Sequence, residues 1–336
     1  MNLIQPNGQP QWGRFDALPS DINWRDYDAR TALGHPRSVW VKPWLMKHFD
    51  FYGLTAPNFT LGVGLVRLGL VNSAFAYWAQ DGVLRERVQF DLPMDAGLTV
   101  DYRPLGTTRW RHPWRSNHHI TSHRQANLRR LEFRLGSYLN GEVELRCNDD
   151  EALSMNTPIG NTGFAYAQKT SGCPVQGYIQ CGGTTLELPE HTGCYHDWTA
   201  GFLRRETFWN WACATGMDHR TRTRLSVNLA RGVNETSAHE NVVWVNGRRH
   251  DLPLTLFDYD RDNVMAPWRV YSQCGQVDLY FKPTGQIDDH RNLGLLASRF
   301  NQCHGEFSGT LSVPGLGQTF HAQSFTGWCE DHYAKW

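Results

Sequence analysis

The stretch ENVVWVNGRRHDLP, residues 240–253, has the pattern of a complete β-hairpin. An apolar run rich in valine ends at Asn246-Gly247, and the chain then returns through a second short segment. Asn-Gly is preferred in the two-residue turns of hairpins because these turns need a positive φ angle at both positions. The stretch is therefore predicted to form two antiparallel strands joined by a tight turn.

The same alternation of short apolar segments and turns continues in both directions along the chain. Asp81-Gly82 and Cys274-Gly275 mark two further turns, and helical patterns are scarce. Short strands with turns about every ten residues are typical of antiparallel β-barrels and sandwiches, so the predicted fold class is mostly β. The segments predicted to contain strands are FTLGVGLV, VNSAFAYWAQ, VLRERVQFDL, HITSHRQANLRRLEFRL, RVYSQCGQVDLYFKP and GEFSGTLSVPG.

Chain length and composition predict two domains. The 336 residues exceed what one ordinary core organises, and a polar, glycine-rich stretch precedes LELPEHTG near the middle. We expect an irregular N-terminal segment over residues 1–35, which docks through Trp12 and Trp24. A first β-barrel-like domain is expected over residues 36–188 and a second over residues 189–336.

The charge balance excludes a general attraction to polyanions. Lys plus Arg and Asp plus Glu both number 33, whereas 14 Trp, 16 Phe and 12 Tyr favour strands and sites for apolar ligands. We therefore expect a lipophilic small molecule as ligand and no nucleic acid; the sequence identifies no protein partner. No secretory signal or integral membrane segment is recognised, and the eight cysteines lack a disulfide framework, so a cytoplasmic location is expected.

Cofactor and metal motifs are not found. The sequence has no P-loop, dinucleotide fingerprint or paired-cysteine redox motif, so no cofactor is expected. His191, Cys194 and His196 lie close together, but their spacing lacks the pairs typical of zinc sites, and no metal is expected. The basic, aromatic stretch RWRHPWRSNHHITSHR is interpreted as a solvated hairpin.

The stretch CYHDWTAG, residues 194–201, holds the leading catalytic candidates, His196 and Asp197. In a strand their side chains point to opposite faces, so one of them is expected to face inward. A carboxylic acid desolvated by aromatic neighbours can keep a proton at neutral pH and deliver it to a weakly basic substrate. Alternatively, Asp197 forms a structural ion pair with Arg204 or Arg205.

Further candidates come from three other segments. Glu240 and Glu330 are possible additional acids, although either could instead serve a structural hydrogen bond. Trp209 and Trp211 share one face of a strand, either inside a pocket or packed between the barrels. The full set of candidate ligand-binding residues is Tyr195, Trp198, Trp209, Asn210, Trp211 and His332.

Several of these stretches together resemble the bacterial family catalogued as domain of unknown function 2804. They are RSVWVKPWLMKHFDFYGL, CYHDWTAGFLRRETFWNWACATG, LSVNLARG, HENVVWVNGRRHDL, LYFKP and GWCEDHYAKW. More distantly, the chain is similar to lipocalin-like carotenoid hydratases and AttH-like proteins, which have an Asp-His-Glu-Trp-Gly stretch. Here the corresponding order is His196-Asp197-Trp198, without the glutamate.

This resemblance implies two calycin or lipocalin-like antiparallel β-barrel domains in tandem. Together with the candidate acids, it leads to two hypotheses for function. The first is a cofactor-independent enzyme that hydrates, isomerises or cyclises an isoprenoid or acyl-type molecule with a carboxylic acid as proton donor. The second is a non-catalytic, lipocalin-like carrier of a hydrophobic ligand. Calycin barrels serve both roles, so the fold does not decide between them.

Overall fold

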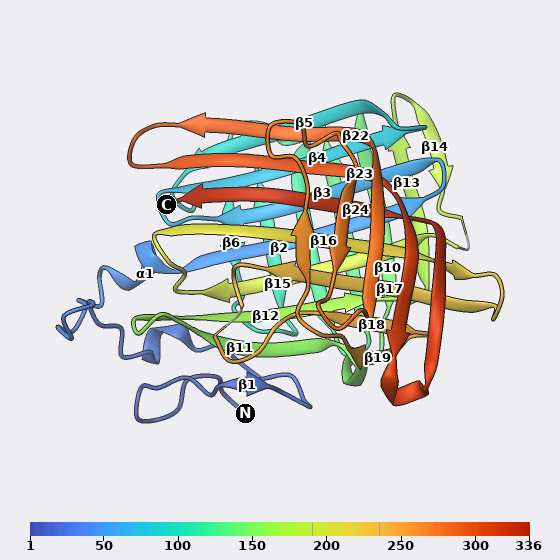
Figure 1. The fold of residues 1–336 in the computed structure, drawn as a ribbon. Helices are drawn as coiled ribbons and strands as arrows, with labels where there is room; N and C mark the ends of the chain where they lie inside the picture. The colour runs from blue at the N-terminus through green and yellow to red at the C-terminus, as the bar shows by residue number, and fades with distance from the viewer. Residues whose placement is uncertain (190, 235) are drawn as a thin grey trace.

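The computed structural model describes residues 1–189, 191–234 and 236–336, and most of them lie in three antiparallel β-sheets (Figure 1). The predicted mostly β fold is confirmed. Within these described ranges, one short α-helix, α1 (Lys42–Leu45), and three 3-10 turns accompany the strands: η1 (Trp24–Asp26), η2 (Asp149–Glu151) and η3 (Pro314–Leu316). None of the helices in the described residues has the length and apolar character needed to cross a membrane.

The first sheet has eight strands in the order β1-β11-β12-β15-β2-β3-β4-β5. The strand β15, which holds the CYHDWTAG stretch, lies at its centre between β12 and β2. The strands of this sheet are β1 (Gly13–Arg14), β2 (Lys47–Ala56), β3 (Phe59–Arg67), β4 (Val71–Gln80), β5 (Val83–Pro93), β11 (Leu153–Ile159), β12 (Gly163–Ser171) and β15 (Gly193–Gly201).

The second sheet has seven strands in the order β14-β13-β10-β9-β8-β7-β6. It packs on one face of the eight-stranded sheet through an apolar cluster that includes Leu54 and Leu61 from one sheet and Leu131 and Phe133 from the other. Its strands are β6 (Leu98–Val100), β7 (Thr107–Arg111), β8 (His118–Gln125), β9 (Leu128–Leu135), β10 (Leu139–Arg146), β13 (Val175–Cys181) and β14 (Thr184–Glu187).

The third sheet has nine strands in the order β19-β18-β17-β16-β24-β23-β22-β21-β20. It curves around its own apolar core, in which Trp268 and Phe307 are fully buried. Its strands are β16 (Glu206–Asp218), β17 (Thr223–Arg231), β18 (Val242–Val245), β19 (Arg248–Asp251), β20 (Leu256–Asp258), β21 (Trp268–Tyr271), β22 (Val277–Asn292), β23 (Ala297–Val313) and β24 (Gln318–Lys335).

The hairpin predicted around residues 246 and 247 is present in the third sheet. The strands β18 and β19 pair through it, and Asn246 and Gly247 have φ angles of 49° and 82°. Both residue types tolerate this left-handed region better than others do. The turn therefore forms where the sequence indicated it.

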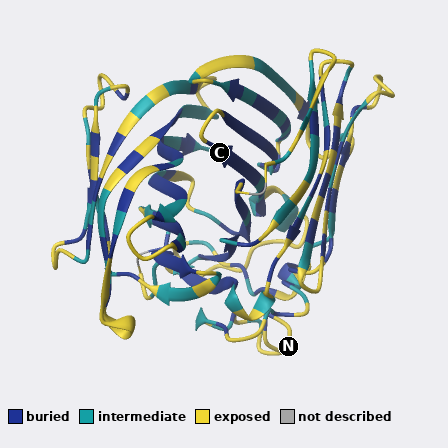
Figure 2. Ribbon diagram, turned by 90° about the vertical axis from the view of Figure 1, so that its right-hand side faces the viewer, coloured by how far each residue is buried: buried dark blue, intermediate teal, exposed yellow. Residues whose placement is uncertain are grey.

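The eight-stranded sheet is the middle layer of the molecule. The side chains on its second face meet the nine-stranded sheet through a cluster of Tyr195, Trp211, Cys213 and Trp328. Burial alternates along many strands, with buried and exposed positions following one another (Figure 2). Successive side chains of a strand point to opposite faces, so the two faces of the middle sheet provide two separate internal environments.

The N-terminal segment covers the part of the middle sheet that the seven-stranded sheet leaves open. Trp24 is buried there with Tyr166, Trp198 and Phe202. Trp24 therefore docks as expected, whereas Trp12 is 44% exposed and does not. The expectation for Trp12 was wrong because the side chain lies outside the apolar cluster that Trp24 joins.

The chain changes from the middle sheet to the nine-stranded sheet between β15 and β16, at residues 202–205. This point lies after the domain boundary expected from the sequence at residues 188 and 189. The strand β15 pairs with β12 and β2 along its length, so its residues share a sheet with the N-terminal half of the chain. The division into two independently folding domains stays a prediction.

Candidate functional site

The middle sheet directs several polar residues toward the seven-stranded sheet. On β2, the residues His48, Asp50 and Tyr52 alternate with side chains that point the other way, and on β15 His196 and Trp198 do the same. The strands β2 and β15 pair so that Tyr52 lies opposite His196 and Asp50 opposite Trp198. Polar groups from two neighbouring strands therefore meet inside the first pair of sheets.

Asp50 is the centre of this polar group. Its Oδ2 lies 2.6 Å from Arg124 Nη1 and its Oδ1 lies 3.1 Å from His196 Nε2, and all three side chains are fully buried. Arg124 also donates to the hydroxyls of Thr108 and Ser122, at 3.1 Å each. Burial alone would raise the pKa of Asp50, but Arg124 and His196 lower it well below its ordinary value.

The contact with Asp50 fixes the tautomer of His196. Asp50 is ionised and can only accept, so His196 Nε2 must carry the proton that it donates. Burial lowers the pKa of His196, so its ring is neutral near pH 7 and Nδ1 has a free lone pair. That Nδ1 is buried and has no hydrogen-bond partner among the described residues. The ring thus resembles a general base held in place by a carboxylate.

More polar atoms without partners lie on the same face of the middle sheet. Both ring nitrogens of His48, both amide atoms of Gln168 and the hydroxyl of Thr170 lack a hydrogen-bond partner within the described part of the chain. Burial lowers the pKa of His48 to about 3, so this ring is neutral as well. Buried polar groups are normally satisfied, so such a concentration indicates a place where a ligand or water supplies the missing hydrogen bonds.

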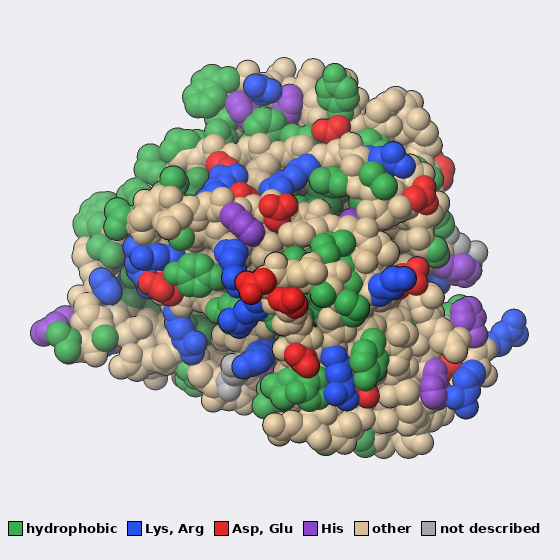
Figure 3. All heavy atoms as spheres, turned by 45° about the horizontal axis from the view of Figure 1, so that its top comes forward, with side chains coloured by type: hydrophobic (Ala, Val, Ile, Leu, Met, Phe, Trp, Pro, Cys, Tyr) green, Lys and Arg blue, Asp and Glu red, His purple; other side chains and the backbone are tan. Residues whose placement is uncertain are grey.

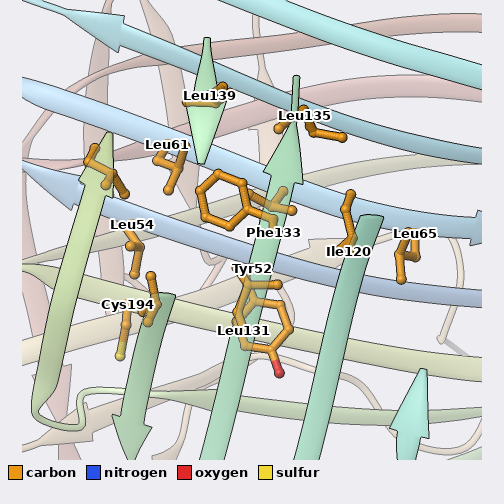
Figure 4. Packing of buried hydrophobic residues seen from close by; sticks show 14 of the residues in the cluster. Tyr52, Leu54, Leu61, Leu65, Ile120, Leu131, Phe133, Leu135, Leu139 and Cys194 are labelled. Carbon is orange, nitrogen blue, oxygen red and sulfur yellow. The ribbon is translucent and has the colours of Figure 1, made fainter. Parts of the chain in front are cut away.

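Tyr52 links this polar group to an apolar wall. Its hydroxyl lies 3.0 Å from Ser122 Oγ, and its ring centroid is 4.4 Å from that of His196. In Figure 4 the Tyr52 ring lies beside Leu131, and its oxygen points away from Leu61 and the other leucines above it. Burial raises the pKa of Tyr52 well above its ordinary value, so the hydroxyl keeps its proton. The interior is therefore apolar on one side and polar on the other.

Asp197 points to the opposite face and belongs to a different group. Its Oδ2 lies 2.5 Å from Lys169 Nζ, and Thr199 donates to its Oδ1 at 3.0 Å. Lys169 also contacts Glu240 at 3.1 Å, and Asn234 donates to the other oxygen of Glu240. Asp197 therefore forms an ion pair, but with Lys169 rather than with Arg204 or Arg205. Glu240 joins the same ion pair.

Glu330 lies in a third group, between the middle sheet and the nine-stranded sheet. It accepts hydrogen bonds from Trp209 Nε1 at 2.7 Å and from Gln302 Nε2 at 2.9 Å. Gln302 in turn accepts a hydrogen bond from the buried Tyr77 hydroxyl. His332 Nδ1 lies 3.5 Å from Glu330, and the His332 ring packs on Trp209 with a centroid distance of 4.0 Å. Glu330 thus combines deep burial with mostly neutral partners.

The remaining candidates from the sequence are distributed between these environments. Tyr195 and Trp211 pack between the sheets, and Trp211 donates to Asn228 at 2.9 Å. Trp198 lies in the first interior, where the Arg124 guanidinium is 5.0 Å from the centre of its ring. Asn210 points toward the core that the nine-stranded sheet encloses and donates to the Tyr259 hydroxyl at 3.0 Å. The structure therefore places Trp198 beside His196 and the other three elsewhere.

Sequence reasoning did not select Asp50, His48, Arg124 or Lys169. The alternation KHFDFY contains a usable signal, because it places a histidine, an aspartate and a tyrosine on one face of a single strand. Arg124 gives no comparable signal, since three more arginines follow on the next strand, β9, and the sequence does not single out one of the four. Its role depends on the packing of two sheets, which local patterns do not reveal.

The sequence profile described as Domain of unknown function (DUF2804) matches residues 25–336. The chain belongs to this family. A search of curated proteins finds no match. The fold is similar to that of CghA, solved with Sch210972, with a TM-score of 0.52 and 12% identity over 98% of this chain and 94% of that chain.

Two further solved structures are similar to this DUF2804 protein. A putative AttH from Nitrosomonas europaea has a TM-score of 0.51 and 12% identity, with 85% of this chain and 91% of that chain covered. Kievitone hydratase from Nectria haematococca has a TM-score of 0.48 and 10% identity, with 86% and 88% covered. At these identities the similarities to CghA and to the putative AttH show a shared fold, in agreement with the lipocalin-like architecture expected from the sequence.

Proposed function

We propose that this protein is an enzyme that moves a proton on a lipophilic small molecule, by hydration, isomerisation or cyclisation, at the Asp50–His196 pair. The observation that carries the proposal is the buried, unpartnered Nδ1 of a histidine that a carboxylate orients through Nε2. A base and a group that orients it are two of the parts that general acid–base catalysis requires.

The chemistry follows from the charge states of the group. His196 Nδ1 accepts a proton from carbon or from a water molecule, and Asp50 stabilises the imidazolium that forms. The same nitrogen then returns the proton to another atom of the substrate, so atoms and charge balance without an electron acceptor. Arg124 keeps Asp50 ionised throughout, and the protonated Tyr52 hydroxyl is available as a neutral hydrogen-bond donor.

The surroundings support a lipophilic substrate. The residues beside Tyr52 in the interior are mainly leucines, with Phe133 and Ile120, and pockets for small molecules are usually apolar with a few convergent polar groups. The fold is also that of CghA, whose structure was solved with Sch210972. Entry of a ligand requires movement, because the side chains of Asp50, Arg124 and His196 have no exposed surface.

The acids selected from the sequence receive different roles in this proposal. Asp197 and Glu240 are assigned to a structural ion pair, because each contacts Lys169. Glu330 is the second candidate acid, because the two side chains that donate hydrogen bonds to it, Trp209 and Gln302, are neutral. His332, which can carry a positive charge, lies 3.5 Å from it. A carrier function is the alternative, and it is favoured by the extent of the apolar interior.

The test works without a known substrate. A lipid-soluble metabolite extract is incubated with the protein in D2O, and mass spectrometry detects compounds that gain deuterium or the mass of water. We expect such a compound with the wild-type protein and with Asp197→Asn, but not with His196→Gln. Circular dichroism and thermal unfolding of each variant confirm that it is folded.

The outcomes separate enzyme from carrier. Compounds that bind and are recovered unchanged, with no isotope exchange, would support the carrier. Exchange that persists in His196→Gln and disappears in Glu330→Gln would move the catalytic assignment to the group between the sheets.

A further inference from the structure

One margin of the molecule exposes an unusual number of large apolar side chains. Trp40 is 82% exposed and Trp114 is 78% exposed, although tryptophan is normally well covered in a folded protein. Four segments form this margin, which we call the aromatic rim: residues 31–46, 68–70, 94–97 and 111–117. Its exposed apolar residues are Leu33, Val39, Trp40, Trp44, Leu70, Met94 and Trp114.

The four segments are neighbours in space. The turn at 68–70 lies against the Trp44 backbone, and its last carbonyl accepts a 2.9 Å hydrogen bond from the Met94 amide. The turn at 94–97 is joined to the last segment, because the Gly97 carbonyl accepts a 2.9 Å hydrogen bond from the Arg111 amide. The loop before α1 projects beyond the sheets at the left of Figure 1, and hydrophobic side chains gather along the left-hand margin of Figure 3.

The rim is also positively charged in a chain that is neutral overall. It contains Arg37, Lys42, Arg111 and Arg115, against a single acid, Asp95, which already binds Arg67. Among the described residues, no carboxylate pairs with any of the four cations. The Lys42 ammonium donates to the backbone carbonyls of Arg25 and Tyr27, at 2.8 Å and 2.6 Å.

We propose that the aromatic rim docks on an anionic lipid surface. Exposed indoles and aliphatic side chains interleaved with Lys and Arg match a negatively charged interface, where rings enter the headgroup region and cations meet phosphates. An acidic protein would match the charge but not the many exposed apolar side chains on separate turns. The proposal goes beyond the proposed chemistry, since it concerns where the protein is held and is independent of His196.

The rim lies beside the polar interior described above. Residues 31–46 lead directly into β2, and Leu45 and Met46 pack in the same cluster as Trp198. His48 follows two residues later. Docking of the rim would therefore bring lipid next to the segment that covers the interior, which suits a lipophilic ligand.

Vesicle sedimentation tests the proposal. The wild-type protein should sediment with vesicles of phosphatidylcholine and phosphatidylglycerol, and much less with phosphatidylcholine alone. Trp40→Ala should weaken the partitioning roughly tenfold, as expected for losing one large apolar contact. Arg37→Gln and Arg115→Gln should each weaken it about fivefold, because a cation near an anionic surface contributes about 1 kcal/mol.

Trp12→Ala is the matched control, because Trp12 is exposed next to β1, at the opposite edge of the middle sheet from β5. It should partition like the wild type. The proposal is overturned if the wild-type protein does not bind the anionic vesicles, or if the rim variants bind as well as it does. It is also overturned if Trp40→Ala abolishes self-association in solution and leaves vesicle binding unchanged, which would make the rim a contact between copies of the chain.

Discussion

Two buried ion groups lie on opposite faces of the same sheet, one around Asp50 and one around Lys169. In the Lys169 group, one ammonium meets two carboxylates, and the second oxygen of each carboxylate has its own donor. In the Asp50 group, the charges are also paired, but His196 and its neighbours His48, Gln168 and Thr170 retain polar atoms without partners in the described part of the chain.

The difference shows how a structural ion pair and a reactive site can be told apart. A structural ion pair is complete when all of its donors and acceptors are hydrogen-bonded, because each unpaired polar group in an interior without water lowers the stability of the fold. A reactive site retains polar groups without hydrogen-bond partners, and a bound ligand supplies those partners. By this criterion the Lys169 group holds the sheets together and the Asp50 group is where chemistry is expected.

The largest effect should come from removing the cation of the Asp50 group. In Arg124→Met, the fully buried Asp50 loses its charged partner, and the free energy of unfolding should fall by about 3–5 kcal/mol. Urea denaturation measures this change. Arg269→Met, which removes a solvent-exposed pair with Asp278, should leave the midpoint almost unchanged. An equal loss in the two variants would contradict the burial argument.

The next largest effect is a loss of folding stability at low pH. His48 is neutral in the folded state, with a pKa lowered by burial to about 3, so the unfolded state binds a proton more readily below about pH 6.5. The contribution of the neutral His48 ring to the free energy of unfolding is therefore complete above that pH. It is lost as the pH falls toward 3, at up to about 1.4 kcal/mol per pH unit. Asp50 adds to the loss only below about pH 4.

Replacing His48 by glutamine should make the fall in stability between about pH 6.5 and pH 4.5 about 2–3 kcal/mol smaller than in the wild type. His219→Gln, at an exposed position, should keep the wild-type dependence. Urea unfolding at several pH values provides the comparison. Identical slopes for wild type and His48→Gln would show that His48 is already charged in the fold.

Asp197→Asn should have a moderate effect. Lys169 keeps Glu240 as a partner, so the variant loses one charge-assisted hydrogen bond and about 1.5–3 kcal/mol of stability. Adding Glu240→Gln removes the second partner and should cost more than the two single changes together. Strict additivity in this double-mutant cycle would argue against a shared lysine.

The smallest expected change is Tyr52→Phe, which removes one hydrogen bond to Ser122 and retains the ring. Stability should fall by about 0.5–1.5 kcal/mol. If Tyr52 assists the reaction, turnover of the compound found in the D2O experiment should fall more than this stability loss explains. A loss of stability with unchanged turnover would restrict Tyr52 to a structural role.

The fold could be predicted from local patterns, since tight turns such as Asn246-Gly247 and period-two alternation report directly on sheets. The stretch at residues 194–201 draws attention by its composition, but its partners could not be foreseen. Asp197 meets Lys169 because β15 pairs with β12, and His196 meets Asp50 because β15 also pairs with β2. Both contacts depend on which strands become neighbours, and that choice is made by the packing of the whole sheet.

The central claim is that His196 presents an unprotonated Nδ1 to the interior while Asp50 holds its Nε2 proton. Nitrogen-15 NMR of the labelled histidine rings measures this directly, with the His196→Gln variant assigning the signals. We expect His196 to be a neutral ring at neutral pH, protonated at Nε2 only, and its Nδ1 shift to change when the D2O-active compound is added. A charged ring, or a neutral ring protonated at Nδ1, would contradict this assignment.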